Sequence, residues 1–146
     1  METIDFYYFC SAAQTGNIDA LQNCLEAGIN IHACNDIALR YAVENNHTET
    51  VIFLLENGAD IHSLDNHKLR NSALYGDIET VKNLLKKGFC SQEAKTYALY
   101  NAILAGHTEI VKLFLENDIC ILSNNYSILN FCTNEEIIAL FEDYLK

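Results

Sequence analysis

Six cysteines and five histidines are among the side chains of this 146-residue chain that could act as nucleophiles, bases or metal ligands. Nucleophilic catalysis by cysteine needs a base, an orienting group and a site for the oxyanion, all held together. A hydrolase of this kind would draw on Cys10, Cys34, Cys90 or Cys120. The chain has no G-x-S-x-G motif, no phosphate-binding loop and no pair of carboxylates that can be placed in one cleft. We therefore predict that the protein is not an enzyme.

The histidines and cysteines are not spaced as metal ligands. There is no C-x-x-C pair and no cluster of histidines, which are the spacings that mark zinc sites. His32 and His62 occupy equivalent places in the sequence, but no third ligand follows the same register. We expect neither a metal nor another cofactor, and we expect structural roles for His47 and His107.

The charge of the chain restricts its partners. Twenty acidic residues against nine basic ones give a net charge of −11, whereas nucleic-acid binding requires a basic surface that displaces counterions. Residues 1–60 carry nine acids and one base, residues 61–94 four acids and five bases, and residues 95–146 seven acids and three bases. We predict that nucleic acid is not a partner, and that the acidity either keeps the protein soluble or favours a basic partner surface.

Hydropathy and the first residues indicate a cellular location. No stretch is long and apolar enough to predict a membrane span, and the acidic start at residues 1–5 is unlike a secretory signal. We therefore expect no membrane partner and an intracellular protein, cytoplasmic with the nucleus as an alternative. Its cysteines are then predicted to be free thiols.

A period of thirty residues organises the chain, and repeats of this length are typical of a solenoid. One column of recurring positions holds mostly glycine, at Gly16, Asn46, Gly76 and Gly106. A second such column follows at Gly28, Gly58, Gly88 and Asp118. Leucine recurs at Leu25, Leu55, Leu85, Leu115 and Leu145. Small residues recur at Ala12, Ala42, Ser72, Ala102 and Cys132. No insertion breaks the period, so the units are predicted to be alike in structure.

Each unit is predicted to form two short helices. In residues 48–58 the apolar positions follow the spacing of one helix face, and Gly58 is placed to end the helix in a left-handed conformation. A unit of this size cannot bury its apolar faces alone, so neighbouring units must stack. Thr133 and Glu136 form a predicted capping box for the last helix. The shorter first helices are predicted over residues 36–45, 66–75 and 96–105.

The second half of each unit resembles an ankyrin repeat. The clearest copy is N-H-T-E-T-V-I-F-L-L-E-N-G-A-D-I at residues 46–61, and G-H-T-E-I-V-K-L-F-L-E-N at residues 106–117 repeats it. The family's T-P-L-H-x-A motif is reduced to a leucine and a small residue, as in residues 37–42. The units are also thirty residues long, shorter than the family's thirty-three. The missing residues fall where the family carries its hairpin tip.

The resemblance implies an all-α ankyrin-repeat solenoid of stacked helix-loop-helix units with shortened β-hairpin loops. We expect one domain over residues 1–146. Its expected repeats are residues 5–35, 36–65, 66–95 and 96–125, followed by a degenerate capping repeat at 126–146. Compact repeats without proline are also similar to those in ankyrin proteins of large DNA viruses, which would make this a viral protein that acts on a host protein in the host cytoplasm.

The resemblance further implies recognition of another protein, because ankyrin stacks bind partners through the concave face of their loops and first helices. We therefore predict a non-catalytic protein–protein interaction module that is itself monomeric. One alternative is an adaptor subunit that recruits a host protein to a larger complex such as a ubiquitin ligase. Another is a structural protein that forms homo-oligomers.

The last turns of the first helices are predicted to face solvent on the concave side. Glu44 makes this position polar in the second unit, whereas Leu74, Tyr75 and Leu104 make it apolar in the next two. Exposed apolar clusters mark interfaces, so these residues are the predicted contact surface for a partner protein. The helix starts predicted to form its polar rim are Asp36, Asn66 and Thr96.

Overall fold

The computed structural model describes residues 6–117, 129–130 and 132–146, and within these ranges every regular element is a helix. The chain divides into two compact units, Met1–Leu64 and Asp65–Lys146, each described here by itself. The first unit holds α1 (Phe6–Thr15), α2 (Ile18–Glu26), α3 (Ile37–Glu44) and α4 (Thr48–Glu56). The second holds most of α5 (His62–Tyr75), then α6 (Ile78–Lys87), α7 (Gln92–Ala105), α8 (Thr108–Glu116) and α9 (Glu135–Tyr144). The all-α repeat architecture is confirmed, whereas the single domain and its repeat boundaries stay predictions.

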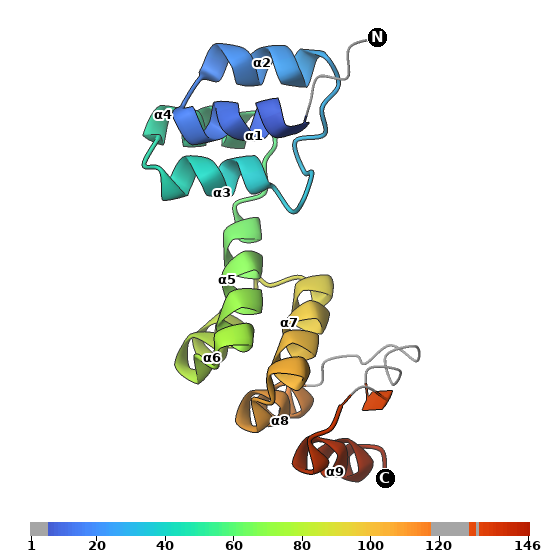
Figure 1. Ribbon diagram of the computed structural model, residues 1–146. Coiled ribbons are helices and arrows are strands. Elements are labelled where there is room, and N and C mark those ends of the chain that lie inside the picture. Colours follow the sequence, from blue (N-terminus) through green and yellow to red (C-terminus); the bar gives the residue numbers. More distant parts are fainter. Residues whose placement is uncertain (1–5, 118–128, 131) are drawn as a thin grey trace. The chain divides into compact units, whose positions relative to one another are not determined.

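In the first unit, α1 and α3 lie side by side (Figure 1). The second helix of each repeat packs against its first helix, α2 against α1 and α4 against α3. Small side chains permit this close approach, because Ala12 of α1 and Ala38 and Ala42 of α3 are buried. The larger buried side chains of this core are Phe9, Leu21, Leu39 and Leu54. Burial of each leucine contributes about 1.5–3 kcal/mol relative to exposure. The column of small residues therefore has the packing role that the sequence predicts.

In the second unit, α5 lies beside α7, and α8 packs against α6, α7 and α9 (Figure 1). Two long-range hydrogen bonds fix α7 against α5. The Asn101 side chain donates to the Arg70 carbonyl at 3.1 Å, and His107 Nε2 contacts the Leu74 carbonyl at 3.0 Å. The larger side chains of this core are Leu69, Val81, Leu84, Leu99, Ile103, Ile110, Val111, Phe114, Leu115, Ile137 and Phe141.

The first helices α5 and α7 begin earlier than the sequence predicts. The segments 62–65 and 92–95 form the additional first turn of these helices, and they contain neither glycine nor proline, which would disfavour a helix. Ser91 then caps α7, with its hydroxyl accepting a hydrogen bond from the Ala94 N–H at 3.1 Å. Within the described residues, plain loops and this additional helical turn stand where the sequence predicts shortened hairpins.

The second helices end as predicted, because Gly58 and Gly88 follow α4 and α6 with φ of +99° and +76°. The equivalent Asp118 lies outside the described residues. The prediction for α9 is wrong by one residue, since Asn134 rather than Thr133 caps the helix. The Asn134 Oδ1 accepts hydrogen bonds from the N–H groups of Glu136 and Ile137.

Candidate functional site

The last turns of α5 and α7 in the second unit expose the apolar residues that the sequence places there. The hydrogen bond between His107 and the Leu74 carbonyl brings the end of α7 against the end of α5. The exposed fractions of Leu74, Tyr75 and Leu104 are 39%, 78% and 64%, so all three side chains face solvent. Adjacent first helices therefore present an exposed apolar surface.

Tyr97 belongs to the same surface, although sequence reasoning did not select it. It is 49% exposed and lies two turns before Leu104 on α7. Residues seven apart share a helix face, and this spacing could have identified it. Tyr97 also makes an edge-to-face contact with Tyr100, with ring centroids 6.5 Å apart. We call Leu74, Tyr75, Tyr97 and Leu104 the apolar face.

The prediction that Asp36 lies on an exposed polar rim is wrong. Asp36 is only 5% exposed, and its backbone adopts a left-handed conformation with φ of +53° just before α3. Its carboxylate accepts a hydrogen bond from the Asp60 N–H at 2.9 Å and contacts His32 Nδ1 at 3.0 Å. The side chain therefore ties the loop before α3 to the loop after α4, and it is unavailable to a partner.

The other predicted rim residues are also placed differently. Asn66 and Thr96 lie within α5 and α7 because these helices begin earlier, and both are half-buried. The Asn66 side chain accepts from the Ser91 N–H at 2.9 Å, and the Thr96 hydroxyl donates to the Gln92 carbonyl at 2.9 Å. Glu44 is exposed in the first unit, with an oxygen 3.7 Å from Arg40 Nε.

His47 and His107 join successive repeats within each unit. His47 Nε2 lies 2.8 Å from the Gln14 carbonyl oxygen, as His107 Nε2 lies beside the Leu74 carbonyl. The imidazole of His47 packs on Gly16, where a Cβ atom would come within 2.8 Å of Nδ1. Only a residue without a side chain fits beneath each ring, so these histidines have the structural role that the sequence predicts.

The three buried cysteines of the described residues lack the surroundings of a catalytic nucleophile. Cys10, Cys24 and Cys90 are buried, and burial raises the pKa of each thiol. A raised pKa lowers the thiolate fraction, and the thiolate is the nucleophile. Cys34 is exposed and Cys132 is half-buried, while Cys120 lies outside the described residues.

Two further features bear on ligands and membranes. Across the described ranges, no three side chains among histidine, cysteine, aspartate and glutamate gather closely enough to hold a metal ion. None of the described helices combines the length and apolar character that crossing a membrane requires.

Stacked two-helix units with glycine-terminated second helices, histidine bridges between repeats and an exposed first-helix face define a helical repeat protein. A family model described as ankyrin repeats (3 copies) matches residues 7–65 and 69–142. The chain therefore belongs to the ankyrin-repeat family. Proteins of this family are generally protein–protein interaction modules and are typically not enzymes. No curated protein matches the chain.

Proposed function

We propose that this protein is a non-catalytic interaction module that binds a partner protein through its first helices, with the apolar face as the centre of the contact. The observation that carries the proposal is the exposure of Leu74, Tyr75, Tyr97 and Leu104 on neighbouring helices. Aromatic and aliphatic side chains that become buried dominate the energy of protein interfaces. Their solvent exposure in this chain supports a role in contacting another polypeptide.

The family resemblance and the cysteine environments support a non-enzymatic role. Within the described residues, the three buried thiols have raised pKa values, and the imidazole rings of His47 and His107 contact backbone carbonyls of the preceding repeat. We propose an intracellular, cytoplasmic protein, with the nucleus as an alternative. We further propose that the protein is viral, with a host protein as its partner and the host cytoplasm as its location, on the resemblance of its compact repeats without proline to those of ankyrin proteins of large DNA viruses.

Affinity capture from the cells that produce the protein tests the apolar face. Leu74→Glu combined with Leu104→Glu places charge at the centre of the contact, and loss of a buried leucine costs about 1.5–3 kcal/mol. We therefore expect at least about tenfold weaker binding of the specific partner. Ile52→Glu is the matched control, because Ile52 is exposed to a similar degree but lies on the second helix α4.

The result contradicts the proposal if the double variant keeps a wild-type circular dichroism spectrum and retains every partner that the control retains. Sedimentation at two protein concentrations separates the alternatives. Concentration-dependent association that the double variant abolishes would assign the face to homo-oligomers. If the wild type is monomeric and the double variant loses a single partner, the result supports binding of a different protein. An adaptor role, such as recruitment to a ubiquitin ligase, would in addition require a second partner that the double variant retains.

A further inference from the structure

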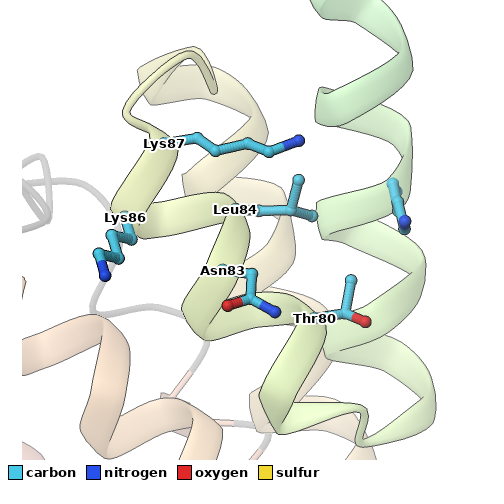
Figure 2. Close-up of a pocket in the computed structure, with 6 residues that line it drawn as sticks. Thr80, Asn83, Leu84, Lys86 and Lys87 are labelled. Carbon is cyan, nitrogen blue, oxygen red and sulfur yellow. The ribbon is translucent and has the colours of Figure 1, made fainter.

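A hollow of about 570 Å³ lies between α5 and α6 of the second unit, on a surface that the apolar face does not include. It is lined by Lys68, Thr80, Asn83, Leu84, Lys86 and Lys87. Figure 2 shows Thr80, Leu84 and Lys87 extending from α6 toward α5, while Lys86 lies at the rim and points to the other side of α6. We call this hollow the lysine groove.

The other repeats provide an internal comparison for these lysines. Lys86 stands where the equivalent residues are Glu26, Glu56 and Glu116. Lys87 stands where the other repeats have alanine or asparagine, and Lys68 stands where the second and fourth have alanine. Nothing in the helix-pair architecture requires lysine at these positions, because the other repeats form the same helices without it. The charge is therefore a property of this groove and not of the fold.

The lysines of the groove are available to an external anion. Lys87 contacts Asp65 at 3.8 Å with an exposed side chain, and an ion pair of this kind contributes little and is readily exchanged. Lys68 lies near enough to Asp77 to help lower the pKa of that carboxyl, after the stronger effect of the Thr80 hydrogen bonds. Among the described residues, Lys86 makes no ion pair.

The groove also offers groups that suit a polypeptide. The Asn83 side chain is exposed and carries both a donor and an acceptor, which matches the N–H and C=O groups of a peptide backbone. Leu84 provides an apolar floor. A nucleic acid presents a phosphate at every nucleotide and binds through many basic contacts, whereas this groove has three lysines on a chain of net charge −11. A few carboxylates match the groove better than a continuous polyanion does.

We infer that the lysine groove docks an acidic segment of a protein partner, with carboxylates on Lys68 and Lys87 inside the groove and on Lys86 where the segment passes over its rim. This inference rests on the proposed function, since it specifies the chemistry of a protein partner. It adds a second contact on the same unit as the apolar face.

Fluorescence anisotropy with a labelled glutamate-rich peptide tests the groove. The informative variant combines Lys68→Ala, Lys86→Glu and Lys87→Asn, which restores residues found at these positions in the other repeats. We expect at least about tenfold weaker peptide binding by this variant, equivalent to about 1.4 kcal/mol. The control combines Lys112→Glu and Lys146→Glu, which changes the net charge equally outside the groove. It should bind within about twofold of the wild type.

Binding of the peptide by the wild type should weaken as the salt concentration is raised, because screening shortens the reach of these charges.

The inference is overturned if the wild type does not bind the peptide, or if the two variants lose affinity equally. It is also overturned if the glutamine version of the peptide binds as well, or if a single-stranded oligonucleotide of the same charge binds more tightly. Thermal unfolding shows whether the variants fold. If the triple variant unfolds, Lys87→Asn alone repeats the test at an exposed residue that points into the groove. Because the probe is a peptide and the variants leave Leu74 and Leu104 intact, failure here is distinct from failure of the apolar face.

Discussion

Replacement of Gly16 by alanine tests the histidine bridge between repeats. Gly16 has a left-handed backbone with φ of +74°, and a Cβ atom there would lie 2.8 Å from Nδ1 and 3.0 Å from Cγ of His47. The imidazole would have to move, and the 2.8 Å contact between His47 Nε2 and the Gln14 carbonyl would be lost. The substitution thus combines backbone strain with loss of an interaction between repeats.

The magnitude follows from these two effects. A left-handed alanine costs about 1–2 kcal/mol, and loss of the hydrogen bond adds about 0.5–1.5 kcal/mol. We expect Gly16→Ala to lower the free energy of unfolding by about 1.5–3.5 kcal/mol. Gly28 is the matched control in the same unit, because its φ is +91° but no atom lies within 4 Å of an added Cβ. Gly28→Ala should therefore show only the backbone cost.

Urea denaturation followed by far-ultraviolet circular dichroism measures both free energies. In a His47→Ala background, the additional cost of Gly16→Ala should fall to that of Gly28→Ala, since the ring that blocks the methyl group is gone. Equal destabilisation by Gly16→Ala and Gly28→Ala in the wild-type background would refute the reasoning. The pair Gly76 and Gly88 gives the same test in the second unit, where a Cβ at Gly76 would lie 2.8 Å from Cε1 of His107.

Two further predictions concern thiols and a helix cap. Iodoacetamide should modify Cys34 in the native protein much faster than Cys10, Cys24 and Cys90, because the latter are buried with raised pKa values. Peptide mass spectrometry gives the rates, and equal rates for buried and exposed thiols would contradict the burial. Asp77→Asn should lower stability at neutral pH, because hydrogen bonds from Thr80 lower the pKa of the Asp77 carboxyl in the folded state. The stability from this charge is present above the unfolded pKa of 3.8 and is lost as pH falls through the lower folded value. Urea unfolding at several pH values should show the difference between wild type and variant shrinking toward acid, and a constant difference would argue against the charge.

The sequence predicts the repeat, its helices and much of the core because these depend on local periodicity. The small-residue column is buried at Ala12, Ala42 and Ala102, and Leu54 fills the core. The leucine column is less well predicted, since Leu145 is 52% exposed. Leu145 follows the end of α9 and no later helix covers it among the described residues, so its place in the period does not determine its burial.

The candidate site likewise contains residues whose exposure the sequence predicts and residues whose environment it does not predict. The apolar residues Leu74, Tyr75 and Leu104 are correctly predicted to be exposed, since their position in the repeat determines which way they face. The burial of Asp36 is not predicted, because it depends on a hydrogen bond that its carboxylate accepts from the N–H of Asp60, twenty-four residues further along the chain. In the sequence, the lysine groove is indicated only by the change of net charge over residues 61–94. The groove itself is formed by the packing of α6 against α5.

By itself, the sequence determined that this chain folds as a series of two-helix repeats, because side-chain spacing along the chain sets the apolar faces of helices. The motifs at residues 46–61 and 106–117 added the resemblance to ankyrin repeats. The tertiary structure alone decided that Asp36 is an internal tie and that Lys68 lines a groove with Lys87. Those roles depend on which residues of other segments lie within a few ångströms, and a thirty-residue period does not contain that information.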